Sequence, residues 1–268
     1  MRVALSIAAS DPTGGAGLQA DLQVFRALGV HGAGVITALT VQDTAKVHEV
    51  LPAFPNVVLR QLRTLLADVT PDAVKIGMLA SDDVVRMVEL GLHDLASVPA
   101  DRPPIVIDPV LAASDGTPLL EHRALGGLRD LIGLATLVTP NLSEAEALTG
   151  CDASTEEGTE AAASALVTHL GASAALVKGG HRDGAPDDLL AERAGGSVSL
   201  TWLAGERIEG GPVHGTGCAL ASAIAAELAK GGALRDCVDS GRRFVAEAMR
   251  RAQQKGRLAR FLVFNDPP

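Results

Sequence analysis

The segment with the clearest chemical potential is Gly215-Thr216-Gly217-Cys218, which runs directly into an Ala-rich stretch typical of a helix. Glycines at a helix start leave backbone N–H groups free to converge on one point, and the helix dipole adds about half a positive charge there. The segment therefore predicts an anion-binding site. Cys218 at this start is expected to have a lowered pKa and to orient or deprotonate a hydroxyl group. A glycine turn beside a small buried cysteine would explain the same residues.

Asn141 and Glu144 form a second candidate pair, in a segment that leaves an apolar run and opens a helical pattern. Residues three apart on a helix share one side. An amide and a carboxylate at the carboxyl end of a strand suit hydrated Mg²⁺, which prefers one or two carboxylates together with phosphate oxygens. The alternative is a helix cap in which Glu144 occupies the first turn.

Lys178 and Asp108 each stand at the end of an apolar run, in ALVKGG and VIDPV. A lysine at the binding edge of a sheet can neutralise a transferred phosphate. Asp108 would stand at the same edge as a carboxylate linked to the metal. A strand-terminal lysine in solvent and an aspartate in a turn are the alternatives for these two residues.

Other nucleotide and hydrolase motifs do not fit the chain. The N-terminal loop SDPTGGAG is rich in glycine but matches neither the Walker pattern GxxxxGK[ST] nor GxGxxG, which disfavours a P-loop and a Rossmann dinucleotide site. The sequence has no GxSxG elbow of a hydrolase. The seven histidines are scattered without the spacing of zinc ligands.

The composition limits the possible partners. A net charge of −9 disfavours nucleic acid and anionic membranes, which normally require a basic face. The three cysteines show no paired spacing and indicate a reducing compartment. The N-terminal apolar run meets Asp11 too early for a signal peptide, and no apolar stretch is long enough to span a bilayer. We therefore expect a cytoplasmic protein that binds small molecules.

An alternation of short apolar runs and helical patterns must position these groups. Such alternation predicts a mostly parallel sheet with helices on both faces, and ligands then bind at the carboxyl ends of the strands. No linker-like stretch divides the chain, so residues 1–268 are expected to form one domain. The expected strands cover residues 3–9, 35–41, 72–77, 105–107, 137–139 and 174–177, the expected helices include 15–28, 56–66, 217–230 and 233–253, and residues 189–192 and 198–203 predict an antiparallel hairpin.

Seven segments follow one another along the chain: SDPTGGAGLQAD, ITALTVQDT, KIGML, IDPV, TPNLSEAEALTG, LVKGGH and HGTGCALASAIAAELAKG. Each segment alone is ambiguous, but in this order they closely resemble hydroxymethylpyrimidine/phosphomethylpyrimidine kinases, which are members of the ribokinase-like superfamily. The resemblance implies a three-layer α/β/α sandwich, usually a homodimer, that uses ATP and Mg²⁺. The implied reaction phosphorylates 4-amino-5-hydroxymethyl-2-methylpyrimidine and then its monophosphate to the diphosphate, in thiamine biosynthesis.

The resemblance also implies roles for individual residues. Cys218 matches the position that a catalytic Asp occupies in the sugar kinases, and Gly215, Thr216 and Gly217 would form the anion hole. Gln42 would read the edge of the pyrimidine ring. Met78 and Val110 would form apolar walls of the pyrimidine pocket, and Ala16 and Asp21 would lie near it. The residues that match the nucleotide and metal side are Asn141, Glu144, Lys178 and Asp108.

Two other functions stay compatible with these residues. The first is a pyridoxal kinase, which shares the fold and the phosphate donor. Gln42 favours an aminopyrimidine instead, because an amide can donate to a ring nitrogen and accept from the exocyclic amine. Gln42 also ends an apolar run. This run is too apolar for an edge that faces solvent, so we expect it to be buried. The second is a non-catalytic sensor of pyrimidines or thiamine, which would have no need of Cys218, Lys178 and Glu144 together.

The C-terminus, residues 260–268, lacks the Gly-His-Gly-rich ending common in the family.

Overall fold

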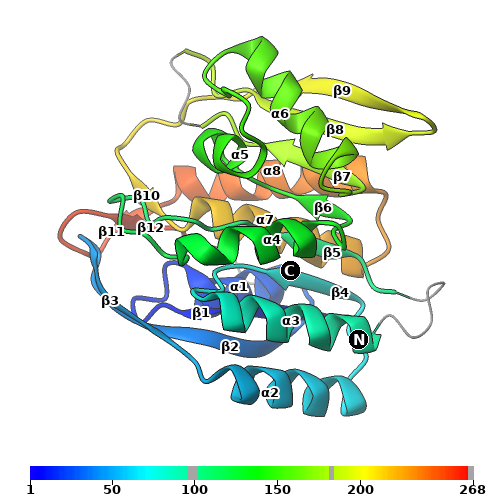
Figure 1. Cartoon of the computed structure of the whole chain (residues 1–268). Helices are drawn as coiled ribbons and strands as arrows, with labels where there is room; N and C mark the ends of the chain where they lie inside the picture. The colour runs from blue at the N-terminus through cyan, green and yellow to red at the C-terminus, as the bar shows by residue number, and fades with distance from the viewer. Residues whose placement is uncertain (96–101, 181–183, 265–268) are drawn as a thin grey trace.

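The apolar runs of the chain form one nine-stranded sheet with the order β3-β2-β1-β4-β5-β6-β7-β8-β9 (Figure 1). The computed structural model describes residues 1–95, 102–180 and 184–264. Neighbouring strands from β2 to β7 run parallel, as the alternation of apolar runs and helices predicts. The strands are β1 Val3–Ser10, β2 His31–Gln42, β3 Val47–Pro52, β4 Ala73–Ile76, β5 Ile105–Ile107, β6 Leu137–Val138, β7 Ala174–Val177, β8 Asp188–Ala194 and β9 Ser197–Leu203.

Antiparallel pairs lie at both edges of the sheet. Strands β8 and β9 form the predicted hairpin, which is confirmed and extends further than expected, with its turn at Gly195 and Gly196. At the other edge, β3 pairs antiparallel with β2. The sequence did not indicate β3, because its residues are exposed or only partly buried and form no apolar run. The continuous sheet takes its strands from residues 3 to 203, and the single domain stays a prediction.

Helices cover both faces of the sheet (Figure 1), which confirms the predicted three-layer α/β/α fold class. Helices α2 to α6 cover one face, and α1, α7 and α8 cover the other. Side chains alternate across each strand, so Leu5 and Ile7 of β1 pack into the first core and Ala4 into the second. The helices are α1 Gly17–Ala27, α2 Pro55–Asp68, α3 Asp82–Leu95, α4 Leu125–Ile132 after the 3-10 turn η2 His122–Ala124, α5 Leu142–Thr149, α6 Glu156–Thr168, α7 Thr216–Ala229 and α8 Leu234–Arg250.

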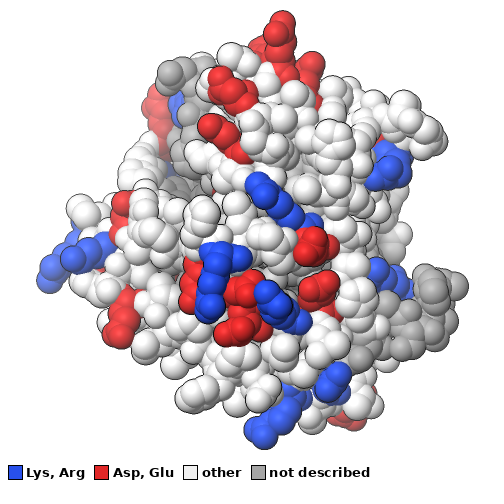
Figure 2. Space-filling model, in the orientation of Figure 1, with Lys and Arg blue, Asp and Glu red and all other residues white. Residues whose placement is uncertain are grey.

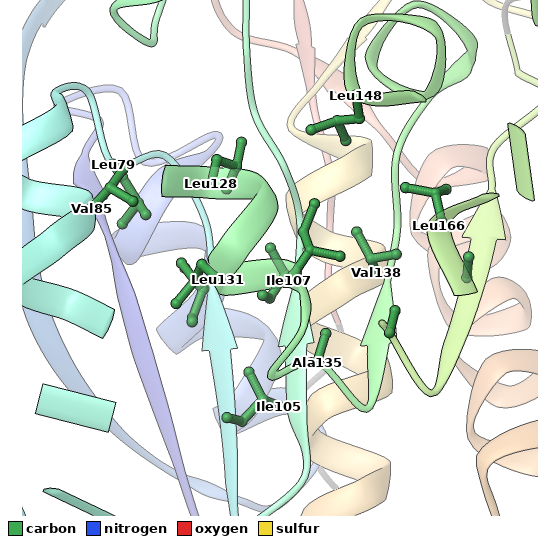
Figure 3. Packing of buried hydrophobic residues seen from close by; sticks show 14 of the residues in the cluster. Leu79, Val85, Ile105, Ile107, Leu128, Leu131, Ala135, Val138, Leu148 and Leu166 are labelled. Atoms are coloured by element: carbon green, nitrogen blue, oxygen red, sulfur yellow. The ribbon is translucent and has the colours of Figure 1, made fainter. Parts of the chain in front are cut away.

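Figure 3 shows the first core, where helices meet the middle of the sheet. Leu131 of α4 lies beside Ile107 of β5, and Val138 of β6 continues the same apolar layer. All three side chains are completely buried. This packing fixes the strand ends from which the predicted site residues project.

A second, three-stranded sheet joins the C-terminal residues to the segment just before Gly215. In it, β12 (Arg260–Phe261) pairs parallel with β10 (Val213–His214) and antiparallel with β11 (Gln253–Gln254). Each of these strands has two residues, which is too short for a hydropathy pattern to reveal, and the sequence did not indicate them. Arg260 and Phe261, the first residues of the atypical C-terminus, therefore lie beside the segment that leads into α7, and residues 265–268 lie outside the described residues.

The surface mixes charges of both signs. On the face that Figure 2 shows, basic and acidic side chains are interspersed in the middle, and acidic side chains gather at the top of the view. Within the described ranges, no helix combines the length and the apolar character that crossing a bilayer requires.

Candidate active site

The start of helix α7 is the centre of the candidate site. Gly215 caps this helix in a left-handed conformation, with a φ of 78°. An added Cβ on Gly215 would also lie 1.8 Å from the carbonyl oxygen of Gly15, so only glycine fits here. Among the described residues no side chain caps the helix, and the N–H groups of its first turn stay available for an anion.

The sheet brings further polar groups to the same edge. Asp108 follows β5, Asn141 follows β6 and Lys178 follows β7, each directly or within three residues. Helix α7 packs across β1, β4 and β5, and β1 is the strand at which the order of the sheet reverses, with β2 on one side and β4 on the other. Ligands of open α/β sheets bind at such a switch point.

Cys218 is half-buried at the third position of α7, next to the Asp108 carboxylate and the Gly17 backbone. Burial raises the pKa of its thiol to about 12, and the nearby Lys75 ammonium offsets only part of that rise. The expectation of a lowered pKa is therefore wrong. The physical reason is that α7 is apolar and deeply packed, so the loss of water around the thiol outweighs the field of the helix start. Cys218 is a neutral thiol in this arrangement.

Lys178 and Asp108 form a buried ion pair, with 2.9 Å between Nζ and Oδ1 and side-chain exposures of 15% and 3%. Burial by itself would lower the pKa of Lys178, but Asp108 and Glu144 raise it above its ordinary value. Burial would raise the pKa of Asp108, but Lys178 and Lys75 hold it below its ordinary value. An added Cβ on Gly217 would lie 3.1 Å from the Lys178 Nζ, so the ammonium lies against the glycine turn that opens α7.

Asn141 and Glu144 cap helix α5 reciprocally. The Asn141 N–H donates to Glu144 Oε2 at 2.7 Å, and the Glu144 N–H donates to Asn141 Oδ1 at 2.8 Å. The helix-cap interpretation is thus confirmed, and the cap also places Glu144 close to Lys178 and Asp108. Burial raises the pKa of Glu144 to about 7, Lys178 lowers it and Asp108 raises it further. This carboxyl group changes its charge near neutral pH.

Gln42 ends β2 and borders an open pocket of about 420 Å³. The hydrogen bonds of the described residues leave its amide without a protein partner. The expectation that the preceding run is buried is wrong, because Leu39 and Val41 are 52% and 49% exposed. The pocket lies between the β2–β3 turn and the C-terminal loop, and its lining residues are Pro12, Thr13, Gln42, Asp43, Thr44, Lys255, Gly256 and Arg257.

Met78 and Val110 lie in one small apolar cluster with Ala9 and Leu119, as expected for two walls of one pocket. Met78 is almost completely buried, with 7% of its surface exposed, and Val110 is half-buried. The backbone oxygen of Met78 accepts from the Thr37 hydroxyl at 2.6 Å. This bond fixes the β4–α3 connection from which the cluster is built.

Ala16 caps α1, and its N–H donates to Asp11 Oδ2 at 2.9 Å. The same carboxylate lies 2.9 Å from His214 Nε2 and accepts from the backbone of Thr13 through Oδ1 at 2.8 Å. Burial would raise the pKa of Asp11, but the bonds from His214 and Thr13 hold it below its ordinary value. Asp11 and His214 thus tie the N-terminal loop to the turn before Gly215. Neither residue was predicted from the sequence, where their membership of two glycine-containing motifs was the only signal.

Asp21 is completely buried beneath the site, where it pairs with Lys75 at 2.9 Å. Its expected place near the pyrimidine pocket stays a prediction, and its charge acts on the Cys218 thiol. Lys75 was missed as a functional candidate, although one signal was available. A lysine between Val74 and Ile76 interrupts a run that is otherwise apolar enough to be buried on both faces.

The residues present fit phosphate groups and a hydrated metal ion. The turn at Gly215 exposes N–H groups, and Lys178 adds a cation beside it. Across the described residues, no cluster of three or more His, Cys, Asp or Glu side chains forms a ready-made metal cage. Mg²⁺ does not need one, because it keeps several waters and binds through one or two carboxylates and the phosphates of a substrate. Asp108 and Glu144 are the carboxylates closest to Lys178 on this edge.

A family model described as phosphomethylpyrimidine kinase matches residues 11–261 of the chain. The chain is 43% identical over 258 residues to the hydroxymethylpyrimidine/phosphomethylpyrimidine kinase of Mycobacterium tuberculosis, which covers 94% of this chain and 90% of the relative. It is 41% identical over 264 residues to a thiamine biosynthesis bifunctional protein of Geobacter sulfurreducens, covering 94% of this chain and 50% of that longer protein.

Two solved structures match the fold closely. The phosphomethylpyrimidine kinase of Clostridium difficile superposes with a TM-score of 0.80 at 33% identity, covering 93% of this chain and all (100%) of that one. The pyridoxal kinase of Staphylococcus aureus in complex with AMP-PCP and pyridoxal superposes with a TM-score of 0.83 at 29% identity, covering 98% of this chain and 93% of that one.

Proposed function

The chain belongs to the phosphomethylpyrimidine kinase family, and on that premise we propose that it phosphorylates 4-amino-5-hydroxymethyl-2-methylpyrimidine and then its monophosphate. ATP is the proposed donor, and thiamine biosynthesis is the proposed pathway. Relatives that carry both kinase activities in their names support the two steps. A relative named for thiamine biosynthesis supports the pathway.

The observation that carries the proposal is the meeting of Gly217, Cys218 and Lys178 at one helix start. Phosphoryl transfer requires positioning and neutralisation of charge more than covalent catalysis. The N–H groups of the turn would bind the transferring group, and the Lys178 ammonium would neutralise it. Cys218, as a neutral thiol, would hold the acceptor hydroxyl by hydrogen bonding beside the anion-binding turn.

Mg²⁺ is proposed to bind between the nucleotide and the two carboxylates of this edge, Asp108 and Glu144. When bound, it would draw negative charge from the phosphate oxygens. Asp108 supports this role because it is held ionised by Lys178 and Lys75. Glu144 supports it because its pKa of about 7 allows a cation to favour the ionised form.

Gln42 is proposed to bind the aminopyrimidine edge, with Met78 and Val110 against the flat face of the ring. The amide has no partner among the hydrogen bonds of the described residues, so its donor and acceptor are both free for a ligand.

Pyridoxal kinase is the second candidate function. The close superposition on a pyridoxal kinase that holds AMP-PCP and pyridoxal favours it. A non-catalytic sensor is the third, and the nearness of Cys218, Lys178 and Glu144 at one edge argues against it. The higher sequence identity to the hydroxymethylpyrimidine/phosphomethylpyrimidine kinases, 43%, favours the pyrimidine over pyridoxal.

A phosphotransfer assay separates these functions. The purified protein is incubated with ATP and Mg²⁺, and hydroxymethylpyrimidine, its monophosphate and pyridoxal are each offered as acceptor. We expect formation of the pyrimidine monophosphate and diphosphate, with a larger kcat/KM for the pyrimidine than for pyridoxal. A larger kcat/KM for pyridoxal would assign the second function, and saturable binding without transfer to any acceptor would assign the sensor.

The homodimer and the cytoplasmic location stay predictions. Sedimentation equilibrium of the purified chain would test the dimer, and fractionation of the source cells would test the location.

A further inference from the structure

Lys75 is a completely buried lysine in the middle of β4. Its Nζ lies 3.0 Å and 2.9 Å from the two carboxylate oxygens of Asp21, and both side chains have no exposed surface. Removing two charges from water is costly, and well-packed apolar residues are often at least as stable in their place. The proposed roles of the site residues leave this pair unexplained.

Four structural elements meet at this pair. The Asp21 carboxylate, from α1, accepts from the Ser6 hydroxyl of β1 at 2.6 Å and from the Ser222 hydroxyl of α7 at 2.7 Å. Lys75 supplies the link to β4. Asp21 is thus held by three buried donors, and its orientation is fixed. Ser222 stands one helical turn beyond Cys218 on the same side of α7.

The ammonium group lies on the active-site side of the pair. An added Cβ on Gly77 would lie 2.7 Å from Lys75 Nζ, so the ammonium reaches the first residue beyond β4, where the strand ends at the ligand-binding edge. Lys75 lowers the pKa of Cys218 and Asp21 raises it, so both charges of the pair act on the thiol. The pair is therefore an oriented dipole beneath the start of α7.

We propose that Lys75 is a positioning residue for phosphoryl transfer, whose buried positive charge, anchored by Asp21, supports the anion-binding turn and the Cys218 thiol from below. This inference rests on the proposed kinase function. Lys75 does not touch a substrate, so it acts on the charge that develops during transfer and not on ground-state binding. Charges that are preorganised in a site without water stabilise such developing charge most effectively.

The test uses the double variant Lys75→Met/Asp21→Asn, because Lys75→Met alone would leave a buried carboxylate unpaired. The amide that replaces the Asp21 carboxylate can still exchange hydrogen bonds with the hydroxyls of Ser6 and Ser222. We expect a folded protein in which kcat falls about 10- to 100-fold while the KM values for ATP and the acceptor stay within about threefold of wild type. Inhibition by ADP with aluminium fluoride, which mimics the charge of the transferring group, should weaken in parallel.

The matched control is Ser6→Ala, which removes one hydrogen bond to Asp21 and keeps both charges. We expect it to lower the thermal unfolding midpoint and to leave kcat unchanged. A folded double variant with wild-type kcat and wild-type inhibition would overturn the proposal and make the pair purely structural.

A second variant decides the matter if the double variant does not fold. In Gly77→Ala the new methyl group would displace the Lys75 ammonium without changing any charge. We expect kcat to fall about three- to tenfold with little change in the KM for ATP, and an unchanged kcat would contradict the proposal. The wild-type assay separates failure of the Lys75 proposal from failure of the proposed function. Each variant is compared with wild type on the acceptor that the wild type phosphorylates. If the wild type phosphorylates no acceptor, the comparison uses ATP hydrolysis.

Discussion

On the proposed phosphate side of the site, Asp108 follows β5 and Lys178 follows β7, and both lie close to Glu144 in the first turn of α5. On the proposed pyrimidine side, Gln42 borders an open pocket between the β2–β3 turn and the C-terminal loop, and the nearby Leu39 and Val41 are about half exposed, at 52% and 49%. The first region is held by the centre of the sheet, and the second by the end of β2, next to the edge strand β3, and a short loop.

This difference separates chemistry from selectivity. Charges that must stay fixed during phosphoryl transfer lie where packing prevents them from relaxing. Gln42, which is proposed to read the edge of the ring, lies where few contacts restrain it, and a bound ring would supply the contacts that are missing. Met78, which is proposed to contact the face of the ring, is packed in a small apolar cluster. Changes on the phosphate side should therefore alter kcat, and changes on the pyrimidine side should alter the choice between acceptors.

Cys218→Ala should give the largest effect. We expect turnover to drop about 10²–10⁴-fold, the range for losing a positioned catalytic group, while the fold and ATP binding persist. Cys151→Ala is the matched control, because this cysteine lies at the end of α5, away from the start of α7. Near-normal turnover in a well-folded Cys218→Ala protein would show that the thiol is structural.

The state of the same thiol can be measured directly. With its pKa raised to about 12, Cys218 should stay protonated up to about pH 10, so alkylation by iodoacetamide should be slow at neutral pH and should accelerate only as the pH approaches 12. Labelling is followed by mass spectrometry of the Cys218 peptide, with glutathione as the reference thiol. A labelling rate at pH 8 equal to that of glutathione would contradict the electrostatics described for this side.

Gln42→Leu should have the next largest effect, on the pyrimidine side. Leaving polar groups of the ligand unpaired costs about 1–3 kcal/mol, so kcat/KM for hydroxymethylpyrimidine should fall roughly ten- to a hundredfold. ATP binding should not change. Any activity on pyridoxal should fall less, because pyridoxal lacks the aminopyrimidine edge. The ratio of the two kcat/KM values is the measurement, and an unchanged ratio would remove Gln42 from ring recognition.

Glu144→Gln should change the dependence of stability on pH. In the folded protein the pKa of Glu144 is about 7, above its ordinary value of 4.5, so the unfolded chain releases this proton first as the pH rises. The wild type therefore loses stability from about pH 4.5 to pH 7 relative to the variant, by up to about 3 kcal/mol. Urea unfolding of both proteins at pH 4.5 and pH 8, without Mg²⁺, gives this difference. Equal differences at the two pH values would show that Glu144 titrates normally.

The same variant tests the proposed metal role with a smaller expected effect. Removing a carboxylate from the surroundings of the ion should raise the Mg²⁺ concentration that gives half-maximal activity by several-fold. Titration of Mg²⁺ at fixed ATP measures it. Identical half-saturation for both proteins would exclude Glu144 from the metal site.

Thr44→Val should produce the smallest change. Its hydroxyl accepts from the Arg257 N–H at 2.9 Å and ties the β2–β3 turn to the C-terminal loop in an exposed position. We expect the KM for the pyrimidine to rise about two- to threefold, the lower end for a single hydrogen bond, with kcat unchanged. A fall in kcat instead would mean that this side also serves the chemistry.

Local patterns in the chain were enough to predict the α/β/α fold class, the anion-binding turn at Gly215, and the strand ends that carry Asp108 and Lys178. These patterns are apolar runs, glycines at a helix start, and a polar residue directly after a strand. Their order along the chain also predicted the family.

The pKa of Cys218, the burial of Asp21 against Lys75, and the exposure of the strand that leads to Gln42 became visible only in the folded molecule. The pKa of a thiol depends on how many atoms of distant segments exclude water from it, and this number is not a property of the neighbouring sequence. Lys75 is stable inside β4 because Asp21, 54 positions earlier in the chain, meets it there. Such meetings arise from strand order and helix packing, which a local pattern does not contain.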